Sequence, residues 1–178
     1  MNKKTQKKSI KSESKISKKA IFSEKEIVKA REFIQGQEGL RLRGYEDAAG
    51  VMTIGYGHTG DVDGKPITKD MLITKEKAEE LYRKDFEIHS APLKYVKVPL
   101  TINQKIALAS FIYNFGGTKF IKSTLYKKLN AGDYKGAADE FDVWINTRTP
   151  GKRKSEPNIG LINRRKREKE LFLTPDDE

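Results

Sequence analysis

The chain has no cysteine, only two histidines and no long apolar run among its 178 residues. Without cysteine there is no disulfide framework and no thiolate-bound metal, and His58 and His89 are too few for a histidine-rich metal site. No apolar stretch approaches the ~20 residues of a membrane helix. The N-terminal stretch also lacks the apolar core and small-residue cleavage site of a secretory signal. We therefore expect a protein made in the cytoplasm, whose export would need outside help.

Acidic residues are scarce near the N-terminus, where positive charge is concentrated. The formal net charge is +11, and residues 1–20 hold eight lysines against one glutamate. Such a segment cannot bury enough apolar surface to offset its ordering entropy, so residues 1–22 are predicted to form a disordered basic arm. A solvated tail and a tether to an anionic polymer or surface are both open interpretations. Residues 23–174 suffice for one domain with a core, and an acidic tail follows at 175–178.

Two capping boxes and a glycine-containing turn mark the main elements. Ser23 with Glu26 predicts a helix over residues 24–36, which leaves Glu38 in the turn at or just past its end. Residues 42–45 and 51–56 are predicted as strands joined around 48–50, so that Asp47 lies at the bend and Thr53 on the second strand.

Helices dominate the remainder of the chain. Thr101 with Gln104 starts a helix over 102–115 that is apolar almost all round and should be the buried central one. One hairpin followed by many helices indicates an α+β, mostly α-helical class, in which a small β lobe and a helical lobe leave a cleft between them. The other predicted helices cover residues 75–90, 122–130, 134–145 and 159–172.

Two carboxylates and a hydroxyl lie near one another in the sequence, on different predicted elements. Eight residues separate Glu38 from Asp47, and five separate Asp47 from Thr53. Cutting a glycosidic bond needs one carboxyl group to protonate the leaving oxygen and another to activate a water. A partly desolvated glutamate suits the acid and a solvated aspartate the base. Residue types alone leave the alternative of a surface glutamate, a turn aspartate and a strand threonine, and Glu46 is an equally available carboxylate.

A glycine motif directly after Thr53 has the wrong context for a nucleotide site. Residues 55–60 match G-x-G-x-x-G, but a loop follows where a dinucleotide site needs a helix and a parallel βαβ unit. His58, within this motif, has a structural explanation. Asp85 occupies the apolar stripe of the helix over 75–90, where an unpaired charge would be costly, and a His58–Asp85 ion pair would satisfy both groups. A catalytic role for His58 is the alternative.

Basic and aromatic residues in the C-terminal half suggest further functions. A basic cluster could indicate nucleic-acid binding, but Glu156 and Glu168 interrupt it and no nucleic-acid motif accompanies it. We interpret it as a solvated face or a groove for an anionic wall polymer, and we predict that Phe141 and Trp144 are core aromatics rather than sugar platforms. The basic cluster comprises Lys152, Arg153, Lys154, Arg164, Arg165, Lys166 and Arg167.

The segment from Glu38 to His58 closely resembles the phage-type lysozymes, the endolysins of glycoside hydrolase family 24. Their pattern is Glu, eight residues, Asp, five residues, Thr, then Ile-Gly-x-Gly-His, and this chain has every piece. The resemblance covers about residues 24–173 and excludes the lysine-rich arm. Further segments that resemble family motifs are 73–85, 109–116, 123–125 and 160–165 with Glu168.

The resemblance implies a muramidase that hydrolyses the β-1,4 bond between N-acetylmuramic acid and N-acetylglucosamine in peptidoglycan, with no metal or cofactor. It assigns Glu38 as the general acid, Asp47 as the carboxylate that activates water or steadies positive charge, and Thr53 as a holder of that water. Family members are described as inverting, which requires a carboxylate separation of ~6.5–9.5 Å. His58 and Asp85 match the family's paired histidine and acid. The implied substrate-binding residues are Thr59, Tyr113, Asn114 and Thr124.

The resemblance also implies a biological setting, that of a phage or prophage endolysin. Such a protein would be a monomer made in the host cytoplasm, and would reach the wall after a separate pore former such as a holin releases it. The alternatives are a non-catalytic wall-binding module, a bacterial wall-remodelling muramidase and a nucleic-acid binder that uses the basic arm. The intact set of two acids and a threonine argues against a pure binder.

Overall fold

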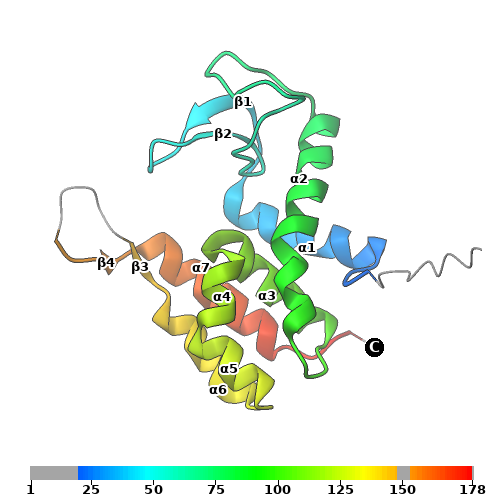
Figure 1. Cartoon of the computed structure of the whole chain (residues 1–178), viewed down its shortest axis with the longest axis vertical. Helices are drawn as coiled ribbons and strands as arrows, with labels where there is room; N and C mark the ends of the chain where they lie inside the picture. Colours follow the sequence, from blue (N-terminus) through cyan, green and yellow to red (C-terminus); the bar gives the residue numbers. More distant parts are fainter. Residues whose placement is uncertain (1–19, 148–152, 178) are drawn as a thin grey trace, which may run out of the picture.

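Two lobes of different secondary structure are spanned by the helix α2, Lys75–Ser90, in the computed structural model, which describes residues 20–147 and 153–177 (Figure 1). The smaller lobe holds the β1–β2 hairpin and the larger lobe is helical, so the α+β, mostly helical class predicted from the sequence is confirmed. In chain order the elements are α1 Glu24–Glu38, β1 Arg41–Glu46, β2 Met52–Gly55, α2 Lys75–Ser90, the 3-10 helix η1 Ala91–Tyr95, α3 Ile102–Phe115, α4 Gly117–Lys122, α5 Thr124–Asn130, α6 Tyr134–Asp139, the 3-10 helix η2 Glu140–Val143, β3 Asn146–Thr147, β4 Glu156–Pro157 and α7 Ile159–Leu173.

Both predicted capping boxes are present. Ser23 and Glu26 start α1, and Thr101 and Gln104 start α3, each side chain accepting a hydrogen bond from the backbone N–H of its counterpart. Such reciprocal bonds satisfy two of the N–H groups that a helix start leaves without partners.

Helix α1 continues two residues past Gly36, where the sequence predicts its end. The Arg167 guanidinium donates to the Gly36 carbonyl at 3.0 Å, and a Cβ at Gly36 would lie 2.8 Å from that guanidinium. Gly36 therefore makes room for the Arg167 side chain and does not break the helix. The helix ends at Glu38, because Gly39 takes a positive φ of 72°.

The hairpin lobe is held together by its backbone and by a small core of its own. Tyr45 on β1 pairs with Thr53 on β2, and the loop after β2 returns to β1, where the Gly44 N–H donates to the Met71 carbonyl at 2.9 Å. A Cβ at Gly44 would lie 2.1 Å from the Thr68 carbonyl oxygen, so this close approach requires glycine. The core of the lobe comprises Ile54, Val62, Ile67 and Leu81.

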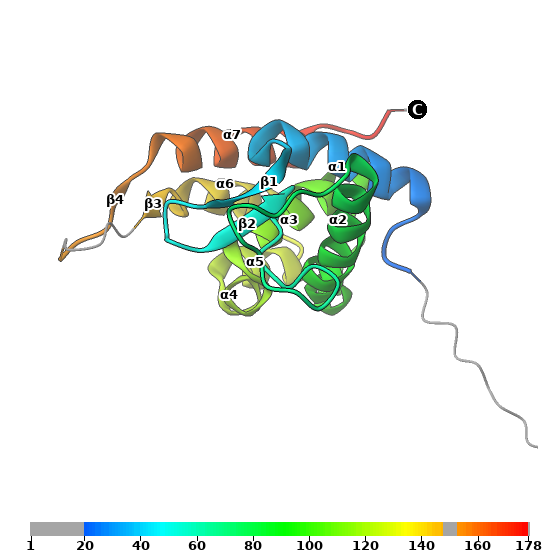
Figure 2. The ribbon, with the colours of Figure 1, turned by 90° about the horizontal axis from the view of Figure 1, so that it is seen from above.

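Helix α3 is the buried centre of the helical lobe, as its almost uniform apolarity predicts. Figure 2 shows α7 and α1 following one another along one edge, with α3, which packs against both, beneath them. Phe141 is fully buried, with its ring 5.5 Å from that of Phe111, and the half-buried Trp144 packs 4.3 Å from Phe115. Both residues thus contact the aromatic core, where the sequence places them.

Two predicted helices have different bounds in the structure. The helix predicted over 122–130 is α5, which starts two residues later because Ser123 caps it and its hydroxyl accepts from the Tyr126 N–H. Helix α4, which ends just before Ser123, was not predicted. The helix predicted over 134–145 changes to 3-10 geometry at Glu140. Within the polar loop that follows, β3 pairs with β4 in antiparallel fashion.

Ile21 and Phe22 belong to the folded part of the chain, which corrects the predicted end of the arm at residue 22. Phe22 is only 6% exposed, its ring lies 4.9 Å from that of Phe86, and Ile21 packs against the same core. An apolar residue just before a helix N-cap commonly anchors the entry of the chain, which explains why the packing begins before Ser23. The rest of the predicted arm, residues 1–19, lies outside the described residues.

The sequence predicts that the basic cluster is a solvated face. The folding of α7 divides this cluster into buried and exposed residues. Arg164 and Arg165 are 7% and 1% exposed, and Glu168 is fully buried between them and α3. Its carboxylate accepts from the Ser110 hydroxyl at 2.7 Å and from Arg164 Nε at 3.2 Å, and it forms an ion pair with Arg165. Burial raises the pKa of Glu168, while the two guanidinium groups oppose that shift. The solvated-face prediction is wrong for these two arginines, because residues three and four apart share one face of a helix with Glu168.

The acidic C-terminal tail caps the central helix. The two carboxylate oxygens of Asp176 accept from the Ile102 and Asn103 N–H groups, each at 2.8 Å. Burial alone would raise the pKa of Asp176, but these two backbone bonds outweigh it and lower the pKa. Because a lowered pKa means that the folded state favours the ionised form, the cap stabilises the fold above the ordinary carboxyl pKa and is lost as the pH falls through the lowered value.

Replacing Asp176 by alanine should therefore lower the free energy of unfolding by about 0.5–2 kcal/mol at neutral pH. Urea denaturation of both proteins at several pH values would measure the difference, which should vanish in strong acid. Asp177→Ala is the matched control, since Asp177 is 94% exposed and its ion pair with Lys29 is long, at 3.7 Å. An equal loss in both variants, or a loss that persists in strong acid, would contradict the capping role.

Candidate active site

One backbone carbonyl brings Asp47 and Thr53 together. The Val51 carbonyl accepts from the Asp47 N–H at 2.9 Å and from the Thr53 hydroxyl at 3.0 Å. The hairpin bend and the start of β2 therefore place the aspartate and the threonine around the same atom. Since Thr53 Oγ1 donates its one proton to Val51, its lone pairs are left as acceptors.

The Asp47 carboxylate is oriented by the bend in which it lies. Its Oδ1 accepts from the Ala49 and Val51 N–H groups, both at 2.8 Å, and Gly50 allows the turn with a φ of 80°. This is the local bonding by which aspartate favours turns. Within the described part of the chain, Oδ2 has no hydrogen-bond partner, so one carboxylate oxygen is committed to the fold and the other is available.

Glu38 is the last residue of α1, and two residues separate it from the start of β1. The direction of its side chain lies outside what the structure describes. Glu46, the competing carboxylate, ends β1 and forms an exposed ion pair with Lys69 at 3.2 Å. Glu46 is thus occupied at the surface of the lobe.

His58 and Asp85 are in direct contact, as the sequence suggests. His58 Nδ1 lies 2.8 Å from Asp85 Oδ2, and the side chains are 12% and 15% exposed. His58 follows the hairpin, and its backbone forms a bridge with Ile54. The pair therefore ties the end of β2 to the middle of α2.

The four substrate-binding candidates lie on three segments. Tyr113 and Asn114 are in the last turn of α3, and the Tyr113 hydroxyl donates to the Tyr56 carbonyl of the hairpin lobe at 3.1 Å. The Asn114 side-chain oxygen accepts from Arg165 Nη2. Thr124 is exposed at the start of α5, and Thr59 is exposed in the loop after His58. Tyr113 thus connects the end of α3 to the hairpin lobe, and Asn114 connects it to α7. In residues 20–147 and 153–177, no hydrogen bond joins Thr59 or Thr124 to either residue.

Comparison with known proteins decides the family. The phage lysozyme family matches residues 35–168. The endolysin of Salmonella phage P22 is 43% identical over 142 residues, which cover 79% of this chain and 92% of that protein. The solved endolysin of Escherichia coli O157:H7 phage FAHEc1 has a TM-score of 0.76 at 38% identity, covering 87% of this chain and 96% of that one. The muramidase domain of SpmX from Asticaccaulis excentricus has a TM-score of 0.72 at 34% identity, covering 86% and 97%.

This chain belongs to the phage lysozyme family. It is accordingly a lysozyme, a glycoside hydrolase that cuts peptidoglycan as phage endolysins do. The family, the enzyme class and the polymer substrate inferred from the Glu38–His58 segment are confirmed. No helix in the described ranges is long and apolar enough to cross a membrane.

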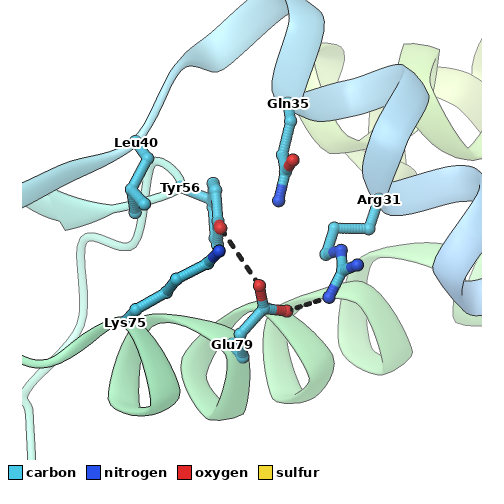
Figure 3. A pocket seen from close by; sticks show the side chains of 6 residues that line it. All are labelled: Arg31, Gln35, Leu40, Tyr56, Lys75 and Glu79. Atoms are coloured by element: carbon cyan, nitrogen blue, oxygen red, sulfur yellow. Dashed lines mark hydrogen bonds and ion pairs between the residues drawn. The ribbon is translucent and has the colours of Figure 1, made fainter.

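A pocket of this lysozyme lies at the lobe junction and contains neither Asp47 nor Thr53. It measures 290 Å³ (Figure 3). The polar groups that line the pocket bond to one another. The Glu79 carboxylate accepts from the Tyr56 hydroxyl at 3.1 Å and forms an ion pair with Arg31. Burial, followed by this carboxylate, raises the pKa of Tyr56. We interpret the group as a connection between α1, the hairpin lobe and α2. The lining residues are Arg31, Gln35, Leu40, Tyr56, Lys75 and Glu79.

Sequence reasoning missed this connection, although one signal was available. Arg31 lies four residues after Ile27 and three before Ile34, on the apolar stripe of α1. A charge at such a position needs a buried partner, and Glu79 supplies it from 48 residues away.

Replacing Asp85 by asparagine should lower stability much more than turnover. The change removes the charge that faces His58, and a hydrogen bond to a charged group contributes about 1.5–3 kcal/mol. Thermal denaturation and initial rates of wall clearing would measure the two effects on one preparation. A large loss of turnover in a normally folded Asp85→Asn protein would instead assign His58 to catalysis.

Proposed function

We propose that Glu38, Asp47 and Thr53 hydrolyse the β-1,4 bond between N-acetylmuramic acid and N-acetylglucosamine. The observation that carries this proposal is the shared Val51 carbonyl, which sets Asp47 and Thr53 around one point. The spacing of the three residues, with Ile54 to His58 behind them, supports it.

Asp47 and Thr53 hold the attacking water. A water at this point donates one O–H to the available Oδ2 of Asp47 and the other to the lone pairs of Thr53 Oγ1. Its own lone pair is then directed away from both residues, toward the anomeric carbon. As the new C–O bond forms, Asp47 takes the proton that the water loses.

Glu38 protonates the glycosidic oxygen as the C–O bond to the leaving sugar breaks. Its place at the C-terminal end of α1 suits this role, because the negative end of the helix dipole favours the neutral acid over the carboxylate. The resulting oxocarbenium-like centre is stabilised by the negative charge of Asp47.

Analysis of the products tests the reaction. Purified peptidoglycan is digested, the new reducing ends are converted to alcohols with borohydride, and the fragments are sequenced by mass spectrometry. Muramic acid should be the reduced sugar. Reduced glucosamine would place the cut at the other bond, and an anhydro-muramic end would show that no water attacks, which would remove the proposed role of Asp47 and Thr53.

We propose that the lysozyme acts as a monomer, made in the cytoplasm of a phage-infected or lysogenic host and released by a holin-type pore former. The phage endolysins among its relatives support this setting. The SpmX muramidase domain supports a second candidate, a bacterial enzyme that remodels its own wall. The neighbouring genes would separate the two, since a holin gene beside this one is expected only for the first.

The lysine-rich segment before the folded part is proposed to concentrate the enzyme on anionic walls or outer-membrane lipid. Eight lysines within residues 1–20 support this role. Replacing residues 1–19 by a Gly/Ser segment of the same length should weaken wall binding at low salt and change little at high salt, because exposed charges are screened. Sedimentation with purified walls at two salt concentrations measures it, and equal binding by both proteins at low salt would dismiss the role.

A further inference from the structure

The residues of the proposed reaction belong to different lobes. Glu38 ends α1, which packs on α3 of the helical lobe, whereas Asp47 and Thr53 belong to the hairpin. Protonation of the leaving oxygen and attack by water take place at one glycosidic bond, so the acid and the water-holding pair must be kept at a fixed separation. The fold must therefore fix α1 relative to the hairpin.

The covalent connection between α1 and β1 cannot do this alone. It consists of Gly39 and Leu40, and Leu40 is exposed. Gly39 has a φ of 72°, and in the described part of the chain no atom lies within 4 Å of the place where its Cβ would be. A glycine without packing around it has wide conformational freedom. This connection therefore leaves the angle between α1 and β1 undetermined.

A second attachment lies two helical turns earlier on α1, at Arg31. Its guanidinium forms an ion pair with one oxygen of the Glu79 carboxylate on α2, and the other oxygen accepts from the Tyr56 hydroxyl at 3.1 Å (Figure 3). We call these three residues the Glu79 bridge. Tyr56 is buried and the two charged residues are partly buried, so these bonds are electrostatically stronger than bonds at the open surface.

Tyr56 is bonded at both of its ends. It directly follows β2, and its main-chain carbonyl accepts from the Tyr113 hydroxyl of α3 at 3.1 Å. Its ring lies 5.9 Å from that of Tyr82, in an edge-on contact. Burial and the Glu79 carboxylate raise the pKa of Tyr56, so its hydroxyl remains a donor at neutral pH. The end of β2 is thus fixed to α3 by a backbone group, and to α2 and α1 by the bridge.

We propose that the three residues of the Glu79 bridge are positioning residues, which hold the general acid Glu38 at a fixed separation from the water-holding pair. Arg31 lies seven residues before Glu38 on one continuous helix. Tyr56 lies three residues after Thr53, at the end of the strand that carries it. A shift at the bridge is therefore transmitted through regular backbone to both sides of the site. The inference rests on the proposed function, because it concerns the geometry of that same site.

Two conservative variants break the bridge. Tyr56→Phe removes one hydroxyl and keeps the ring, and Glu79→Gln removes the charge that faces Arg31. Each should lower kcat about 3- to 10-fold with KM nearly unchanged, because a misplaced acid weakens stabilisation of the transition state and leaves binding of the substrate intact. Initial rates on purified peptidoglycan measure both constants, and circular dichroism of both variants should match the wild type.

Matched controls lie outside the bridge. Tyr126→Phe removes a hydroxyl that donates to the Tyr95 carbonyl, also at 3.1 Å, within the helical lobe. Glu80→Gln repeats the second change on the neighbouring residue of α2, whose ion pairs with Lys77 and Lys84 stay within that helix. Both controls should keep the wild-type kcat. An equal fall of kcat in the controls and the bridge variants would overturn the proposal.

Spin labels measure the separation directly, because the chain has no cysteine of its own. Labels on Lys25→Cys of α1 and Ala49→Cys of the hairpin bend, both exposed positions, report the distance between these elements. The bridge variants should shift or broaden this distance and the controls should not, with activity measured on the unlabelled proteins. An unchanged distance in a bridge variant of low kcat would overturn the proposal, as would a wild-type kcat in both bridge variants.

Glu38→Gln, assayed beside these proteins, distinguishes the failure of this inference from the failure of the proposed function. Full activity of Glu38→Gln would remove the proposed function, because Glu38 would not be the acid. An inactive Glu38→Gln beside fully active bridge variants would overturn the role of the bridge alone.

Discussion

Replacing Glu38 by glutamine should abolish wall clearing while the protein stays folded. Glutamine has nearly the same shape but cannot give up a proton to the glycosidic oxygen. General acid catalysis contributes roughly 10²–10⁴-fold to rate, and a glycosidic leaving group depends strongly on it, so we expect a loss near the upper end. Turbidity of purified walls, with wild type and variant at equal concentration, measures the effect.

The control for this prediction lies on the same helix. Glu32→Gln makes the identical change at an exposed position of α1 and should leave the rate unchanged. Circular dichroism of both variants should match the wild type. Full activity of the Glu38→Gln protein would refute the assignment of the general acid and would reopen the possibility that another carboxylate provides the proton.

Replacing Glu168 by alanine should cause the largest loss of stability. Glu168 is fully buried, and its removal leaves the guanidinium groups of Arg164 and Arg165 without their shared carboxylate in the core. Breaking a buried ion pair from one side costs about 3–5 kcal/mol. For a chain of this size that corresponds to a fall in Tm of roughly 6–20 °C.

Differential scanning calorimetry would measure this change. Glu170→Ala is the matched control, because Glu170 is exposed on the same helix and should give a Tm close to that of the wild type. If Glu168→Ala melted like the control, the buried cluster would contribute little to the fold.

Most of the fold and about half of the site could be predicted from patterns within short stretches of the sequence. Capping boxes are sequence-local hydrogen bonds, so the starts of α1 and α3 could be predicted. The aspartate bend is local as well, since Asp47 bonds to residues two and four positions ahead. The Asp85 position could be found because a charge on an apolar stripe demands a partner.

The buried cluster was not predicted, because in composition its charges resemble a solvated face. The partners Ser110 and Glu168 are 58 residues apart, so only the packing of α7 on α3 brings them together. A signal was nevertheless present. Leu161, Arg164, Glu168 and Phe172 recur at helical spacing, which places two charges among core positions.

At the hairpin tip, a main-chain group, the Val51 carbonyl, holds Asp47 and Thr53 in their relative positions. Because the main chain sets the relation of Asp47 to Thr53, the side chains around it are free of that task, and those of Ala48, Ala49 and Val51 all face solvent. This tip is therefore a natural attachment point for a spectroscopic reporter. A label there would report on the surroundings of Asp47 and Thr53 without altering the bonds that hold them.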